Sequence, residues 1–168
     1  MGYSTDFHGQ FNLDAPLTAE QKAYLTKFNQ TRRMSRDPAL TALRPDPVRE
    51  AVGLPLGPEG AYFVGETGFM GQDTGPDVLD SNDHGLQPSR WCGWVPNWQG
   101  NAIEWDGGEK FYAYEKWLEY IIEHFLKPWG RVLNGEVTYE GESPDDFGKI
   151  EIKANVIRVR EGIRTYAP

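Results

Sequence analysis

The sequence has a single cysteine, no long apolar run and no recognisable leader. Cys92 has no second cysteine to pair with, so an intramolecular disulfide is excluded, which fits a reducing compartment. No stretch approaches the roughly 20 apolar residues of a membrane span, and the mean hydropathy is −0.61. The N-terminus has neither a basic region nor an apolar run, so no secretory signal is expected. These absences predict a cytoplasmic protein that makes no use of membranes, folded as one domain over residues 1–168.

Positive charge is also scarce, with 17 Lys and Arg against 25 Asp and Glu and a net charge of −8. Direct nucleic-acid binding is therefore not expected, because such binding depends on neutralising phosphates. The charge is nevertheless uneven. Arg32, Arg33 and Arg36 lie close together after the first predicted helix, whereas residues 136–146 hold five carboxylates and no cation. The arginines are candidate partner-binding residues, and the alternative is an ordinary solvated face.

Established catalytic and metal-binding motifs are missing. The chain has no glycine-rich nucleotide loop, no His-Glu-x-x-His and no cysteine zinc pair, so neither a cofactor nor a metal site is predicted. A calcium loop starting at Asp80 fails because Trp91 occupies its twelfth position. Gly107-Gly108 precedes a predicted helix, but the flanking Asp106 and Glu109 would repel phosphate and are better suited to capping. If the chain is an enzyme, its candidate catalytic residues are Asp80, His84, Asp106 and Glu109.

Aromatic residues, by contrast, are abundant: six tryptophans, eight tyrosines and eight phenylalanines. Four of the tryptophans fall within fifteen residues, which is more than two short strands bury easily: Trp91, Trp94, Trp98 and Trp105. Tryptophan is enriched in binding hot spots as well as in cores. The cluster is therefore a candidate surface for a ligand or partner.

Hydrophobic periodicity predicts an α+β fold with a mainly antiparallel sheet and two principal helices on one face. Extra strands on a ferredoxin-like arrangement would also fit this order. Pro/Gly/Asp-rich residues 65–90 are predicted to be a long irregular loop, either functional or mobile. The predicted strands are 3–13, 61–64, 91–95, 102–106, 131–140, 149–153 and 156–160. The predicted helices are one that follows the capping residue Thr18 and runs to about 33 or 34, then 38–43, 47–52 and one from about 109 to 127.

Three segments, Trp105–Tyr112, Trp117–Tyr120 and Leu133–Val137, resemble a group of uncharacterised proteins encoded by bacteriophages, prophages and scattered bacterial genomes. Phe7–Leu13 and Thr31–Met34 look similar too, so the resemblance covers most of the chain. It implies a phage or mobile-element origin and a bacterial cytoplasm. It implies no catalytic residue.

Two functions and a third, structural role are compatible with these observations. The first is a non-enzymatic binding protein, such as a phage accessory or anti-defence factor, which binds a bacterial host protein or sequesters a small ligand. The second is a small hydrolase or transferase that uses carboxylates of the 65–90 loop with His84 as base. The third is an oligomeric structural component, a homo-oligomer whose aromatic residues fill the interface.

Overall fold

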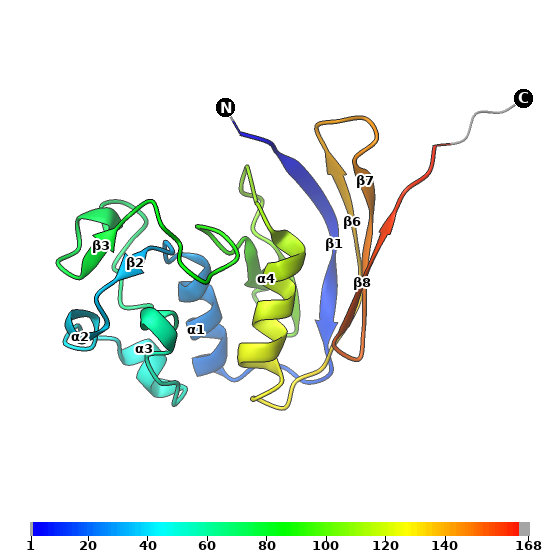
Figure 1. Cartoon of the computed structure of the whole chain (residues 1–168). Helices are drawn as coiled ribbons and strands as arrows, with labels where there is room; N and C mark the ends of the chain where they lie inside the picture. Colours follow the sequence, from blue (N-terminus) through cyan, green and yellow to red (C-terminus); the bar gives the residue numbers. More distant parts are fainter. Residues whose placement is uncertain (1, 165–168) are drawn as a thin grey trace, which may run out of the picture. The chain divides into compact units, whose positions relative to one another are not determined.

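The computed structural model describes residues 2–164, which divide into two compact units. The first unit combines the two ends of the chain, up to Pro16 and from Gly93 onward, and the second is Leu17–Cys92. Figure 1 shows the elements of each. The predicted α+β class with a mainly antiparallel sheet is confirmed, and the one-domain organisation stays a prediction.

The first unit is built on a six-stranded sheet in the order β4-β5-β1-β6-β7-β8, in which every pair is antiparallel. The ferredoxin-like variant stays a prediction. The strands are β1 (Thr5–Leu13), β4 (Trp94–Pro96), β5 (Ala102–Trp105), β6 (Leu133–Gly141), β7 (Phe147–Lys153) and β8 (Val156–Glu161).

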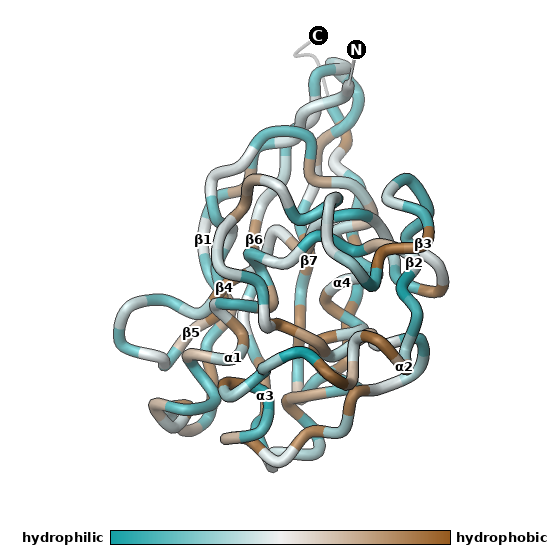
Figure 2. The backbone as a smooth tube through the Cα atoms, turned by 90° about the vertical axis from the view of Figure 1, so that its left-hand side faces the viewer, coloured by the Kyte–Doolittle hydropathy of each residue, from teal (hydrophilic) through white to brown (hydrophobic). Residues whose placement is uncertain are grey.

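Side chains alternate between the two faces of this sheet, as period-two strands require. Phe7 and Phe11 of β1 are buried, whereas His8 between them is exposed. The colours in Figure 2 alternate along the strands in the same way. The buried face packs against α4 (Tyr114–Ile121) and the π-helical segment Ile122–Leu126 that continues it.

The helix α4 begins later than the sequence predicts. Residues 107–113 are irregular, and both Lys110 and Ala113 have positive φ angles that interrupt any earlier helical turn. Phe111 is buried against Trp94 and Phe7. This aromatic anchor holds the connection close to the sheet. The N-cap of α4 is Ala113, without a side-chain capping hydrogen bond, so the predicted capping of α4 by Asp106 and Glu109 is wrong.

The second unit has few regular elements. α1 (Ala19–Asn29) starts at the predicted capping box, in which Thr18 and Gln21 each accept a hydrogen bond from the other's backbone N–H. It ends before Arg32, earlier than predicted, and residues 61–64 are not a strand. The other elements are β2 (Ser35–Arg36), α2 (Pro38–Thr41), α3 (Pro47–Ala51), the 3₁₀ turns Pro58–Gly60 and Gln72–Thr74, and β3 (Val78–Asp80), which pairs with β2.

Trp94 provides a test of the first unit's core. Its ring lies 5.2 Å from Phe7 and 5.4 Å from Phe111 between centroids, and its indole N–H donates to the Tyr114 carbonyl at 2.8 Å. Trp94→Ala is expected to lower the free energy of unfolding by about 3–5 kcal/mol, measured by chemical denaturation, because it leaves a large cavity and removes the indole hydrogen bond.

Trp98→Ala is the matched control. Its side chain is 85% exposed, so the free energy of unfolding is expected to change by less than about 0.5 kcal/mol. Equal effects of the two substitutions would contradict this assignment of core and surface.

Candidate functional site

A buried group of four charged side chains organises the second unit. Asp77 is fully buried and accepts hydrogen bonds from Arg36 at 3.1 Å, Arg44 at 3.0 Å and the Thr41 hydroxyl at 2.7 Å. Glu66, only 10% exposed, accepts from Arg36 at 3.1 Å and from both terminal nitrogens of Arg44 at 3.1 and 3.3 Å. Two cations thus meet two carboxylates, which offsets the cost of burying each charge. We call these four residues the buried ion network.

Phe63 adds an aromatic surface to the buried ion network. The guanidinium carbons of Arg36 and Arg44 lie 5.0 and 4.7 Å from the centre of its ring, within the range of a cation–π contact. The ring is almost completely buried. Both arginines are therefore held by carboxylates and by the aromatic ring, a geometry that the planar guanidinium suits.

The buried ion network fixes the long segment of residues 65–90. Glu66 anchors its beginning, and the Asp77 carbonyl accepts the Asp37 backbone N–H at 2.8 Å where β3 joins β2. Between them, the buried Gln72 side chain donates to the carbonyls of Gln30 and Gly68 and accepts the backbone N–H of Arg32. Polar anchors thus attach this irregular segment, which has few apolar side chains to bury.

The electrostatics of Asp77 follow from these contacts. Burial alone would raise the pKa of its carboxyl group, but the Thr41 hydrogen bond and the Arg36 charge outweigh burial and hold the pKa below the usual value of 3.8. The same carboxylates raise the pKa of Arg44 despite its desolvation. Asp77 and Arg44 are therefore both charged at neutral pH.

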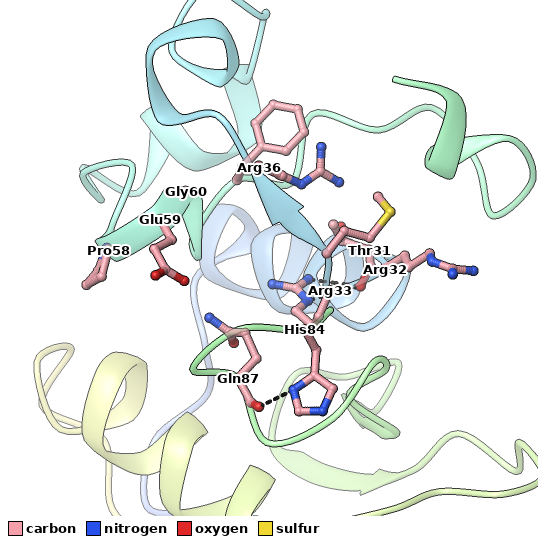
Figure 3. Close-up of a pocket in the computed structure, with 11 residues that line it drawn as sticks. Thr31, Arg32, Arg33, Arg36, Pro58, Glu59, Gly60, His84 and Gln87 are labelled. Atoms are coloured by element: carbon pink, nitrogen blue, oxygen red, sulfur yellow. Dashed lines mark hydrogen bonds between the residues drawn. The ribbon is translucent and has the colours of Figure 1, made fainter. Parts of the chain in front are cut away.

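The predicted arginine group does not converge on a ligand. Figure 3 shows Arg32, Arg33 and Arg36 around one pocket, with their guanidinium groups pointing in different directions. Arg33 is buried, donates to the carbonyls of Phe28, Thr31 and Ala61, and lies 4.0 Å from the Phe28 ring. Arg36 belongs to the buried ion network. As partner-binding residues, Arg33 and Arg36 are corrected to internal structural residues, while Arg32 is partly exposed and donates to the Ser81 carbonyl at 2.8 Å.

The pocket itself is small. Its cavity volume is about 20 Å³, enough for roughly one water molecule. His84 lies at its margin, where Nδ1 is 2.7 Å from the Gln87 carbonyl oxygen. Ligand sites for small molecules are usually about 300–1,000 Å³, so this pocket does not have the size of one.

The candidate catalytic carboxylates are turn residues. Asp80 accepts the Asn82 N–H at 2.9 Å and Asp106 accepts the Gly108 N–H at 2.7 Å, each two residues ahead and exposed. Asp80 and His84 belong to the second unit, and Asp106 and the exposed Glu109 to the first. Within residues 2–164, no group of three or more His, Cys, Asp or Glu side chains is placed to hold a metal ion.

The four tryptophans do not form one exposed surface. Trp94 and Trp105 lie opposite each other in the β4–β5 register and so point to the same face, where both contact Phe7. Trp94 is buried and unavailable to a partner, which corrects its predicted role. Trp98 is exposed in the connecting turn, and Trp91, in the second unit, lies 6.0 Å from Phe69.

Comparison with protein-family models, curated proteins and solved structures finds no match to this chain. In the part of the chain that the structure describes, no helix has the length and apolar character needed to cross a membrane.

Asp77→Asn tests the buried ion network. The amide keeps the shape but leaves Arg36 and Arg44 with one negative partner, so the free energy of unfolding at pH 7 is expected to fall by about 3–5 kcal/mol. Because the folded-state pKa of Asp77 is lowered, its stabilisation is present above the unfolded pKa and is lost as pH falls through the folded pKa. The variant should therefore lose less stability than the wild type when pH falls from about 5 to 2, measured by denaturation at each pH.

Asp73→Asn, at an exposed position of the same segment, is the control and should shift stability by less than about 0.5 kcal/mol. The role given to Asp77 would be contradicted if the Asp77→Asn protein had wild-type stability at pH 7 and lost as much stability as the wild type when the pH is lowered.

Proposed function

We propose that the chain is a non-enzymatic binding protein that contacts another protein through the second unit. The observation that carries the proposal is the set of large apolar side chains that this unit exposes. Four of the six belong to the segment 65–90, so exposure is concentrated where polar anchors fix the backbone. The six and their exposed fractions are Leu40 (44%), Leu43 (80%), Phe69 (59%), Met70 (92%), Leu79 (66%) and Leu86 (81%).

Exposed apolar side chains on an anchored segment suit recognition of a protein. Binding residues are commonly found on loops positioned by a rigid scaffold, because the scaffold reduces the ordering cost of association. Met70 and Phe69 supply adaptable and rigid apolar area respectively. A small ligand is the weaker choice, because the pocket between Arg32, Arg33 and Arg36 accommodates about one water molecule.

The resemblance to phage and prophage proteins supports a bacterial host protein as the partner and the bacterial cytoplasm as the location. An accessory or anti-defence factor acts by covering a surface of a host protein, and this needs contact area but no catalytic group. The turn-bound carboxylates Asp80 and Asp106 are consistent with that reading. The enzyme alternative has no comparable supporting geometry.

The variant Phe69→Ser/Met70→Ser/Leu86→Ser tests the proposal. All three side chains are exposed, so the fold should be retained, while capture of the partner from bacterial lysate should fall at least about tenfold, as expected for loss of hot-spot contacts. The measurement is quantitative mass spectrometry of proteins recovered with wild type and variant.

The matched control, Trp98→Ser/Ile163→Ser, removes exposed apolar side chains from the first unit and should capture the partner as the wild type does. Undiminished recovery of the same protein by the folded triple variant would refute the proposal, as would recovery of a small molecule alone.

A further inference from the structure

The strand β8 is an open edge of the six-stranded sheet. It ends the strand order and, among residues 2–164, pairs only with β7. The opposite edge, β4, has three residues and includes Pro96, whereas β8 has six residues and no proline. Proline and short length protect an edge from pairing with another chain. β8 has neither form of protection.

The hairpin geometry shows which backbone groups face outward. Ala154 and Asn155 have φ angles of 49° and 67° and form the two-residue turn between β7 and β8, as in a type I′ hairpin. The flanking Lys153 and Val156 are then hydrogen-bonded to each other, and hydrogen-bonded pairs alternate along the ladder. The Gly162 N–H donates to the Phe147 carbonyl, so this pair is also hydrogen-bonded, as the alternation requires. Ile157, Val159 and Glu161 therefore direct their backbone N–H and C=O groups away from β7.

One face of the β7–β8 hairpin is cationic. Lys149, Glu151 and Lys153 alternate along β7, and the register places Arg160, Arg158 and Val156 opposite them. Five of these six residues, Lys149 being the exception, line an open hollow of about 540 Å³ together with Ala154. Glu151 engages Arg160 at 2.9 Å, whereas Arg158 and Lys153 make no ion pair within the described residues. Lys149 is paired with Glu136 of β6 at 3.4 Å and with Glu151 at 3.7 Å, so Arg158 and Lys153 are the cations of this face that remain for a partner's carboxylates.

The other face of β8 carries the apolar side chains of Ile157 and Val159, followed by the exposed Glu161. Ile157 and Val159 lie opposite Ile152 and Ile150, which are buried in the core. Burial decreases toward the edge, since Ile157 is half-buried and Val159 is 36% exposed. A strand added beside β8 would extend this apolar row on one face and meet the cationic side chains on the other.

We propose that the β8 edge binds an extended acidic segment of another protein as a seventh strand. Backbone pairing with Ile157, Val159 and Glu161 would supply affinity, and side chains of alternating character would supply specificity. The segment would place carboxylates toward Arg158 and Lys153 and apolar side chains beside Val159. This interaction uses the first unit and does not depend on the function proposed for the second.

Charge selects this occupant over two others. Pairing of β8 with a second copy of itself would bring Arg158 and Arg160 of both chains together, and like charges across a strand pair are destabilising. A nucleic acid would satisfy the cations but would leave the backbone edge and the apolar row unmatched. The net charge of −8 also disfavours a polyanion over a short acidic segment.

A short synthetic peptide that alternates glutamate and isoleucine is the probe, with a lysine-for-glutamate peptide and a single-stranded oligonucleotide beside it. Fluorescence anisotropy should show that only the glutamate peptide binds, and hydrogen exchange should show new protection at Ile157 and Val159. Lys153→Glu/Arg158→Glu should weaken binding at least about tenfold, a typical loss on reversing charges at an interface. Lys116→Glu, on the exposed side of α4, is the matched control and should bind as the wild type does.

Val159→Pro removes an outward N–H that the β7 ladder does not use, so it should abolish peptide binding while the hairpin is retained. If this variant does not fold, the charge-reversal variant still decides the question. Equal binding of the lysine peptide, binding of the oligonucleotide at these residues, dimerisation through β8, or absence of any peptide binding would each overturn the proposal.

Discussion

The burial of one carboxylate, Asp77, constrains most of the second unit. A fully buried charge is tolerated only when opposite charges and hydrogen bonds surround it, and here Arg36, Arg44 and Thr41 do so. Arg36 belongs to β2, Thr41 to α2, and Arg44 follows α2 by three residues. Asp77 therefore determines where the segment 65–90 contacts these elements. Hydrophobic burial is non-directional, whereas these bonds require particular distances and orientations. An irregular segment can therefore be held in one conformation without a large apolar core beneath it.

The first unit depends on a different constraint, the alternation of side chains across an antiparallel sheet. Trp94, Phe7 and Phe11 point to one face because of strand phase, and their rings meet edge to face at 5.2 to 5.7 Å. The pairing of β1 with β6 runs without interruption from Thr5 to Leu13. A shift of one residue would move these aromatic side chains to the solvent face, so the core fixes the register. The outer face is then free to carry charge without cost to the core.

Sequence periodicity predicted the elements that have a buried face and failed where structure depends on distant polar contacts. The strands β1, β6, β7 and β8 and the helices α1 and α4 all follow from spacing, with errors at their ends. The spacing of Trp91, Trp94 and Trp98 wrongly predicts a surface position for Trp94. Its pairing with Trp105 across β4 and β5 places both side chains on the inward face. The buried ion network was missed because Glu66 and Asp77 lie 22 and 33 residues from Arg44. No local pattern marks such a pair. Only the composition of residues 65–90, rich in polar residues, hinted at attachment by polar contacts.

The cationic edge of β8 is informative because the whole chain is acidic. At physiological ionic strength, charges farther apart than about 8 Å are largely screened. The net charge of −8 therefore has little effect on a carboxylate in contact with Arg158 or Lys153. A diffusing acidic partner is therefore attracted at this edge although the chain as a whole is acidic. Attraction between a few charges is modest on a solvated surface, and an acidic surface without a free strand would gain little from it. An extended segment adds backbone pairing and the apolar row beside Val159 to the same contact. Selectivity for acidic strands over acidic surfaces thus follows from the combination of charge, open edge and apolar face.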